Sequence, residues 1–375
     1  MAYEPLSEQG LYAREFIDDL TANHQGYTHT ISAVGGYDSA GFSLKGNRDY
    51  LKDWYDDGLM RRIVLINPEG IVVWEGFVSR LAMTIGTISR TKTIENMYNR
   101  IYMRYAPLDV SVYPPVAGEP ITGIFNDVAS QFDYGIKAAC ISAGERTNSV
   151  VYDWARTVLL NQKDPKEGET VNTGSAESLS MEVECKGYYH TLKWIPYVNY
   201  IAGNIQAHQV IQEILRYYNL ANPGWISQNF DWMYYNFRTA RRGNDDLTSC
   251  WDVIANIIKE GGRGGERWVG GLYQDRKMIY KPAEDVAGLY GEEFELVRAL
   301  SDTGQFIYDA ATGTEVKPRD MTPDKILHTT DLDVGEKDLM YIEQVTFTEP
   351  YNVTLIGDDD QRLSVYLAQR GLPAV

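Results

Sequence analysis

Residues 27–78 constrain the fold of this chain most, because they predict four elements in a fixed order: strand, strand, short helix and hairpin. Residues 27–34 are rich in strand-forming side chains, and the pair Gly35-Gly36 interrupts that run. Residues 42–44 are predicted to form a second short strand, which Gly46 ends. Two neighbouring strands with a glycine break between them are therefore expected at the start of this stretch.

A short helix is predicted over residues 47–57, with Asn47 as its N-cap and Gly58 just after its last turn. The helix is indicated by four apolar residues that share one face at 3.6 residues per turn: Tyr50, Leu51, Trp54 and Tyr55. Residues 62–66 and 71–78 then form a hairpin, because the intervening Asn-Pro-Glu-Gly suits a type I turn.

Three stretches resemble phage tail hub and minor tail proteins. The first is the order IS…GF…FSL.G…L.DWY..GL.R.IVL.N..G.VVWEGFV within residues 27–78. The second is WDVIANIIKEGGRGGERWVGGLYQDRKMIYKP over residues 251–282, and their shared order is more specific than either motif alone. The third, LSMEVECKGYYHTLKWIPY from residue 179, resembles the start of the second tube-like domain in the same families.

The resemblance implies an α+β, mainly β protein with two tail-tube-like β-barrel or sandwich domains and inserted helical segments. It also implies a homotrimer in which each chain gives two tube-like barrels, so that a pseudo-sixfold ring meets a sixfold tube. No catalytic signature comes with it.

The middle of the chain predicts two strands, a connector and two helices. Residues 85–94 read as one strand, and residues 97–105 alternate with a period of two. Such a pair either reaches a neighbouring subunit, as the resemblance implies, or forms an ordinary sheet edge. Residues 107–120 contain four prolines and read as an extended connector. Helices are predicted over 121–132 and 149–161, the second with the apolar face Val150, Val151, Trp154, Val158 and Leu159.

The second half predicts further strands separated by helices. Residues 162–178 are polar and read as a surface loop, and residues 179–198 then turn to strand, including 188–194. Amphipathic helices are predicted over 205–218 and 246–260. The remaining predicted strands are 268–272, 278–280, 294–299, 305–308, 325–329, 340–347 and 352–355.

Four segments follow from these patterns and from the resemblance. They are a first tube-like β-barrel domain (1–118), a helical insertion and linker (119–178), a second tube-like β domain (179–300) and a C-terminal β-rich segment (301–375).

Net charge limits the possible partners. The formal charge is −17, and no basic patch is present, which argues against tight binding of DNA or RNA. An acidic wall would let DNA slide past without sticking, although the charge can equally serve solubility.

No catalytic, cofactor-binding or metal site is predicted. The three cysteines lack paired spacing, the five histidines form no HxxxH or HExxH pair, and no GxSxG or phosphate-loop motif occurs. The N-terminus lacks the features of a signal peptide, and no apolar run is long enough for a membrane span, so we expect synthesis in the host cytoplasm.

Three functions are compared. The first is a structural virion protein at the phage tail tip, a baseplate hub or minor tail protein. It would contact its own copies, the tail tube or distal tail protein and a tip or fibre protein, and would let DNA pass. The second is a tip protein that binds host-surface carbohydrate, and the third, with least support, is a cell-wall hydrolase. The aromatic residues Trp225, Phe230, Trp232, Tyr234 and Tyr235 are candidates for an assembly or glycan surface. Packing in the core or at a subunit contact is favoured over stacking on a sugar for this cluster.

Overall fold

The structure, a computed structural model, confirms an α+β, mainly β protein. It describes residues 20, 23–66, 72–171, 179–198, 205–232, 248–261, 268–282, 294–297, 326–330, 337–348 and 352–358. The predicted turn at 67–70 and the predicted strand at 305–308 lie outside these residues. The division of the chain into two tube-like barrels stays a prediction.

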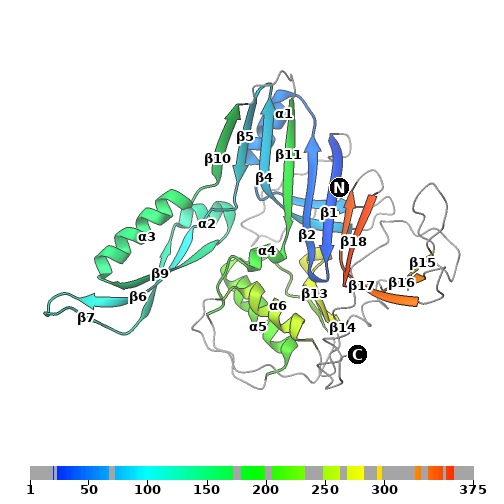
Figure 1. Ribbon diagram of the computed structural model, residues 1–375. Helices are drawn as coiled ribbons and strands as arrows, with labels where there is room; N and C mark the ends of the chain where they lie inside the picture. The colour runs from blue at the N-terminus through cyan, green and yellow to red at the C-terminus, as the bar shows by residue number, and fades with distance from the viewer. Residues whose placement is uncertain are drawn as a thin grey trace.

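Most strands belong to one large, branched sheet whose path is β10-β5-β4-β11-β2-β1-β17-β16-β15 (Figure 1). Strand β3 pairs with β4, β18 with β17, β13 with both β2 and β14, and β12 with β14. The bounds are β1 His24–Ser32, β2 Val34–Leu44, β3 Arg62–Ile66, β4 Val72–Ile85, β5 Ile88–Thr93, β10 Lys166–Val171, β11 Leu179–Gly187, β12 Phe230–Trp232, β13 Trp268–Leu272, β14 Met278–Pro282, β15 Phe294–Val297, β16 Ile326–Thr330, β17 Lys337–Thr348 and β18 Asn352–Asp358.

The predicted short helix is confirmed as α1 (Arg48–Asp57). Its N-cap is Asn47, whose side-chain oxygen accepts a 2.8 Å hydrogen bond from the Tyr50 amide. The helix buries Leu51, Trp54 and Tyr55 against the large sheet. The predicted hairpin is also confirmed, since β3 and β4 pair antiparallel.

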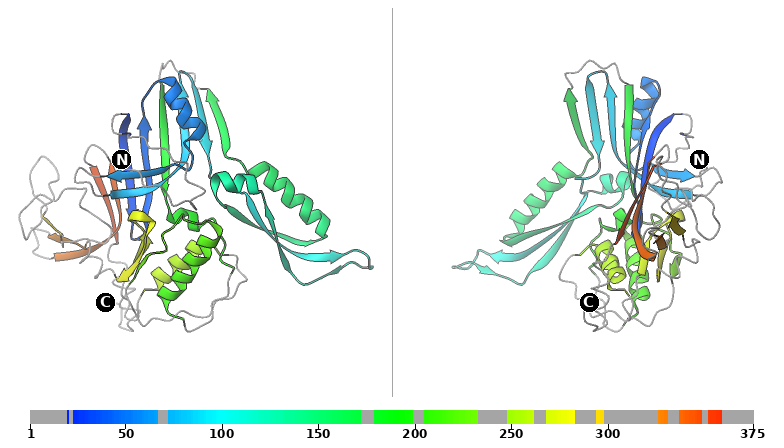
Figure 2. Two further views of the ribbon diagram at one scale, coloured as in Figure 1. Left: turned by 180° about the vertical axis from the view of Figure 1, so that it is seen from behind. Right: turned by 45° about the vertical axis from the view of Figure 1, so that its right-hand side comes forward.

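A second, four-stranded sheet runs along an arm that projects from the large sheet, with β7 at the far end of the arm (Figures 1 and 2). We define the arm as residues 100–163. Within the sheet, β6 pairs with β8, β9 and β7, and α3 packs on it through Val151, Ala155 and Leu159. The elements are β6 Arg100–Asp109, β7 Val116–Ala117, β8 Ile121–Asn126, α2 Val128–Tyr134, β9 Ala138–Arg146 and α3 Asn148–Gln162.

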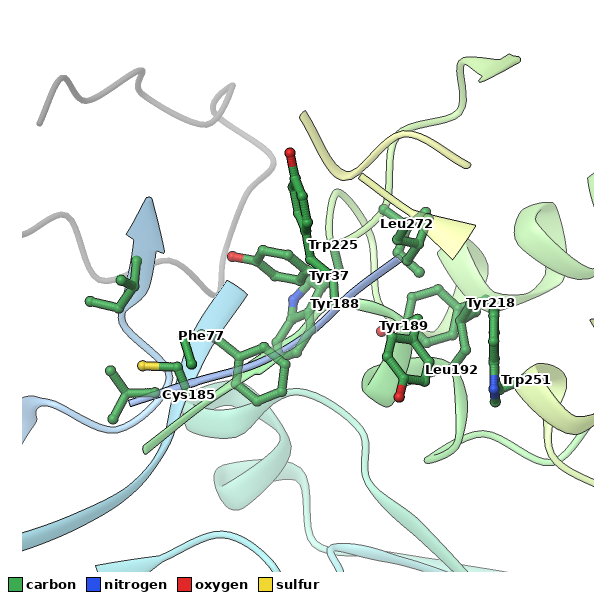
Figure 3. Close-up of a cluster of buried hydrophobic side chains, with 14 of the residues drawn as sticks. Tyr37, Phe77, Cys185, Tyr188, Tyr189, Leu192, Tyr218, Trp225, Trp251 and Leu272 are labelled. Carbon is green, nitrogen blue, oxygen red and sulfur yellow. The ribbon is translucent and has the colours of Figure 1, made fainter. Parts of the chain in front are cut away.

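Three helices pack at the end of the large sheet opposite α1 (Figure 1). They are α4 (Tyr189–Leu192), α5 (Ala207–Ala221) and α6 (Cys250–Glu260). The predicted helices at 205–218 and 246–260 are thus confirmed within a few residues. Figure 3 shows the buried cluster that they share with the sheet. It includes Tyr37, Phe77, Cys185, Tyr188, Tyr189, Leu192, Tyr218, Trp225, Trp251 and Leu272.

Four element predictions are wrong. Residues 85–94 are two strands joined by a turn at Gly86, which has a φ of +60°. Residues 107–120 are no connector, because β6 and β7 pair there. Residues 121–132 begin as β8, because those residues pair with β6, and become helical only after the N-cap Asp127. Residues 188–194 are helical in α4, since the chain turns away from the sheet after Gly187.

Four further features differ from what the sequence predicts. The polar segment 162–178 contains a strand, β10, which pairs with β5. The segment 119–178, predicted as a helical insertion and linker, also holds the strands β8 and β9. In α3, Val150 and Trp154 are 49% and 41% exposed, so the buried face lies one position further along the helix. Strand β11, expected to begin the second domain, lies between β4 and β2 of the first sheet.

Candidate assembly site

The first and second stretches that carry the family resemblance meet at a crossing of glycines. Strand β13 runs parallel to the start of β2, with Gly270, Gly271 and Leu272 opposite Val34, Gly35 and Gly36. A Cβ on Gly36 would lie 2.3 Å from the Leu272 carbonyl oxygen, and one on Gly271 would lie 2.2 Å from the Gly36 nitrogen. Gly36 also has a φ of +78°, which only glycine adopts without strain. The glycines are therefore required by the close approach of the two strands.

A buried carboxylate forms a second link between the same two stretches. Glu75 on β4 accepts a 2.9 Å hydrogen bond from the Arg62 guanidinium and a 2.8 Å bond from the Asp275 amide. The Arg276 guanidinium lies 3.8 Å from the same carboxylate. Burial raises the pKa of Glu75, and the two arginines oppose that rise without cancelling it. The loop between β13 and β14 is thereby tied to β4.

Helix α4 is held on β2 by a polar cluster. The Tyr189 hydroxyl donates a 2.5 Å hydrogen bond to Asp38, and Nε2 of His190 lies 2.8 Å from the same oxygen. Burial alone would raise the pKa of Asp38, but the hydrogen bonds from His190 and Tyr189 outweigh it and lower the pKa. Burial lowers the pKa of His190, against the effect of Asp38. The cluster stabilises the packing of α4 and leaves the Asp38 carboxylate charged.

The base of the arm is fixed to the body by amide side chains. Asn222, at the end of α5, accepts a 2.7 Å hydrogen bond from the Ile136 amide and donates a 3.1 Å bond to the Ile136 carbonyl. The Asn99 side chain donates a 2.7 Å hydrogen bond to the Gly135 carbonyl and accepts a 2.8 Å hydrogen bond from the Lys137 amide. These residues are buried, so the network sets the direction of the arm relative to the large sheet.

Lys137 strengthens the same connection. Its ammonium donates hydrogen bonds to the Ile94 carbonyl and, at 2.8 Å, to the Glu95 carbonyl, both in the link between β5 and β6. It also lies 5.2 Å from the centre of the Trp194 ring. Burial lowers the pKa of Lys137 to about 8. The charged lysine therefore holds the link between arm and body.

The arm carries most of the exposed apolar surface that the structure describes. Of eighteen large hydrophobic side chains exposed on the described residues, twelve lie in the arm. They are Val110, Val112, Tyr113, Val116, Ile121, Ile124, Val128, Phe132, Val150, Tyr152, Trp154 and Leu160. Exposed apolar groups concentrated on one part of a protein are typical of an interaction surface.

The aromatic residues assigned from sequence lie in different environments. Trp225 is 7% exposed and packs edge-on against Trp194, so it belongs to the core and offers no face to a ligand. Trp232 is 39% exposed and stacks on His208 with ring centres 3.9 Å apart, while Phe230 is half-buried. Tyr234 and Tyr235 lie outside the described residues. An assembly or glycan role for Phe230, Trp232 and the two tyrosines stays a proposal.

Metal ligands and membrane-spanning helices are two features that bear on function, and both were sought among the residues that the structure describes. They contain no group of three or more His, Cys, Asp or Glu side chains placed to hold a metal ion. No helix within them is long and apolar enough to cross a membrane. From sequence, only the strand at 97–105 is linked to a neighbouring subunit, through the family resemblance. The exposed apolar side chains of the arm are not predicted, because the fold decides which apolar residues are exposed.

Comparisons with known proteins were made for fold and for sequence. No family model matches the sequence, and no curated protein matches it. Among solved structures, the chain is similar to a tail protein from Neisseria meningitidis MC58, with 7% identity, coverage of 90% of this chain and 93% of that one, and a TM-score of 0.44. It is also similar to the 43 kDa tail protein of prophage MuSo2 from Shewanella oneidensis, with 9% identity, coverage of 88% and 92%, and a TM-score of 0.36.

A third similar structure is an E. coli component of the type VI secretion system, described as similar to the T4 bacteriophage tail proteins gp27 and gp5. It is 9% identical, with coverage of 91% of this chain and 74% of that one, and a TM-score of 0.36. Of these three similar structures, two are tail proteins, one of them from a prophage, and one is a secretion-system component described as similar to phage tail proteins. All three TM-scores are below 0.5.

Proposed function

We propose that this protein is a structural, non-enzymatic component of a phage tail tip, a baseplate hub or minor tail protein. In this proposal copies of the chain form a ring, most simply a homotrimer, that continues the tail tube. The ring anchors tip or fibre components and lets DNA pass. It would be made in the host cytoplasm and reside in the virion.

One observation carries the proposal. Two of the stretches that resemble tail hub proteins fold into one unit, although they lie far apart in sequence. Strand β13 pairs with β2, and the Glu75 carboxylate accepts a hydrogen bond from the Asp275 amide in the loop after β13. The two stretches carry the family resemblance, and they also pack on each other in the structure. A shared fold explains this better than chance similarity of two separate motifs. The glycines Gly36 and Gly271 belong to these two stretches and are the residues that the crossing requires.

Two features support the assembly part of the proposal. The arm exposes apolar side chains that a monomer would leave in water. The formal charge of −17 favours a ring whose inner wall repels phosphate, so that DNA moves through without specific binding.

The test is to locate the protein in assembled particles. Antibodies against this chain should label the tail tip in negative-stain images, and a knockout complemented by the gene should regain complete tails. Single-particle images of the purified protein, alone or mixed with tail tube, should show rings. Label confined to the capsid, or complete tails in the knockout, would contradict the proposal.

A further inference from the structure

The far end of the arm carries an apolar finger, which we define as residues 109–122. It comprises the end of β6, the strand β7 and the start of β8, and β7 marks its place in Figures 1 and 2. Every residue of the finger is exposed, and Tyr113 is 98% exposed. The other exposed large apolar side chains of the finger are Val110, Val112, Val116 and Ile121. Aromatic and aliphatic groups gathered at the end of a projection are typical of an interaction surface.

Hydrogen bonds hold the finger in one shape although it is exposed. The Asp109 carboxylate accepts a 2.9 Å hydrogen bond from the Ser111 amide and a 2.6 Å bond from the Ser111 hydroxyl. The Gly118 amide donates a 2.8 Å bond to the Pro107 carbonyl, and β6 pairs with β7. Three prolines of the finger fix further backbone angles. A segment that is shaped in advance loses less conformational entropy when it binds a partner.

The charges of the finger are all acidic. It contains Asp109 and Glu119 and no lysine, arginine or histidine. The hydrogen bonds from Ser111 lower the pKa of Asp109, so this carboxylate is charged at neutral pH. A membrane with anionic lipids attracts basic segments, and this finger offers it none. A protein surface with lysine or arginine side chains around an apolar groove is complementary to both the charge and the apolar side chains of the finger.

The sequence at the end of the finger favours a groove as its binding place. Residues 112–116 read Val-Tyr-Pro-Pro-Val. Proline-rich segments bind in grooves lined by aromatic side chains, because proline fixes the backbone before contact. A tyrosine that becomes buried on binding is a common anchor of such contacts. Tyr113 is therefore the side chain of the finger best suited to fill the groove.

The described part of this chain offers no matching groove to the finger of a second copy. Outside the arm, Trp232 is the one exposed aromatic side chain among the described residues, and its ring stacks on His208. The other exposed aromatic side chains of the described residues lie on α2 and α3, where Asp133 or Asp153 adjoins them in sequence: Phe132, Tyr152 and Trp154. An aromatic groove with a basic rim is better supplied by a different protein.

We propose that the finger binds in an apolar groove with a basic rim on a different protein. Tyr113 fills the groove, and Asp109 and Glu119 face the lysine or arginine side chains of the rim. The proposal rests on the tail role described above for the place of that partner, which is then another component of the tail.

A photo-crosslinking residue at position 113 tests this contact. A benzophenone-bearing amino acid replaces Tyr113, where the near-complete exposure of the side chain leaves the fold unaffected. The full-length chain is irradiated in the cells that make it, and the adducts are identified by mass spectrometry. We expect an adduct with one protein other than this chain. The control carries the same amino acid in place of Leu220, which is 78% exposed on α5 outside the arm, and should not give that adduct.

A charge reversal tests the basic rim. Glu119→Lys, introduced into the crosslinking chain, places a positive charge opposite the rim and should reduce the yield of the adduct by about fivefold or more. Glu182→Lys is the matched control, because it makes the same change at an exposed position on β11 and should leave the yield unchanged. Circular dichroism of both variants checks that they are folded.

Each outcome decides for or against the proposal. An adduct with a second copy of this chain, an adduct with lipid alone, or no adduct overturns it. An adduct whose yield is the same in Glu119→Lys and Glu182→Lys also overturns it, because the rim is then not basic. The tail role is judged separately by antibody labelling. A chain that labels the tail tip and gives no foreign adduct keeps that role and loses this contact, and a foreign adduct from a chain never found in tails has the opposite meaning.

Discussion

The glycine crossing between β2 and β13 allows a prediction with an internal control. Replacing Gly36 with alanine adds a Cβ that would lie 2.3 Å from the Leu272 carbonyl oxygen and 2.8 Å from the Leu272 nitrogen. It also forces alanine to a φ of +78°. Gly86→Ala is the matched control, because Gly86 has a φ of +60° but nothing within 4 Å of its added Cβ.

The expected magnitudes follow from these two terms. A left-handed backbone costs an alanine about 1–2 kcal/mol, and both variants incur it. Only Gly36→Ala must also push β13 away, which breaks ladder bonds such as the 3.1 Å bond from the Gly270 amide to the Ala33 carbonyl. At about 1 kcal/mol for each lost bond, two or three bonds add about 2–3 kcal/mol. Gly271→Ala, at ordinary φ, should show the clash term alone.

Hydrogen exchange is the suitable assay, because it reports on the crossing itself. An added 2–3 kcal/mol of opening corresponds to roughly 30- to 150-fold faster exchange in peptides covering residues 268–272. The acceleration is expected in Gly36→Ala and Gly271→Ala and not in Gly86→Ala. If Gly36→Ala exchanges no faster there than Gly86→Ala, the close approach of the strands is not what requires glycine, and the reasoning is refuted.

Three further predictions concern buried polar groups. Glu75→Gln should destabilise the protein by about 3 kcal/mol in urea unfolding, because Arg62 loses its anion. Asn222→Leu should accelerate amide exchange at Ile136 at least tenfold and leave exchange in α3 unchanged, since it cuts the bonds at the base of the arm only. His29→Phe should reduce the loss of stability in acid, because burial lowers the pKa of His29 from 6.5 to about 4.

The sign of the His29 effect is fixed by linkage. Between pH 6.5 and about 4 the unfolded chain binds a proton at this histidine and the folded chain does not, so stability falls as pH falls through that window. The full shift is worth about 3 kcal/mol. Wild-type stability measured at pH 7 and pH 4.5 should differ more than that of His29→Phe. Equal differences in the two proteins would show that His29 does not cause the acid sensitivity.

The sequence predicts elements well where the local pattern and the fold agree. The helix at 47–57 has its N-cap bond and its buried face as expected, and the period of two at 97–105 buries Ile101, Met103 and Tyr105 together. The prediction fails at 121–126, where apolar residues at helical spacing pair with β6 along its free edge. There the pairing with β6, and not the apolar spacing within the segment, decides the conformation.

The contacts of the candidate assembly site could not be predicted from the sequence for a similar reason. The bond from the Asp275 amide to Glu75 joins residues 200 positions apart, and the bonds between Asn222 and Ile136 join residues 86 apart. From sequence, Asn222 only marks the end of a helix. The glycine pair at 35–36 reads as a break, whereas in the structure it lies inside β2 and permits the approach of β13.

The position of β11 between β2 and β4 has a consequence for the order of folding during synthesis. Both flanking strands leave the ribosome well before β11, because β4 ends at Ile85 and β11 begins at Leu179. Until then the inner edges of β2 and β4 have no strand between them, and the intervening arm can already form its own small core. A chain that ends near residue 170 and is released would hold the whole arm but leave a gap between β2 and β4 in its main sheet.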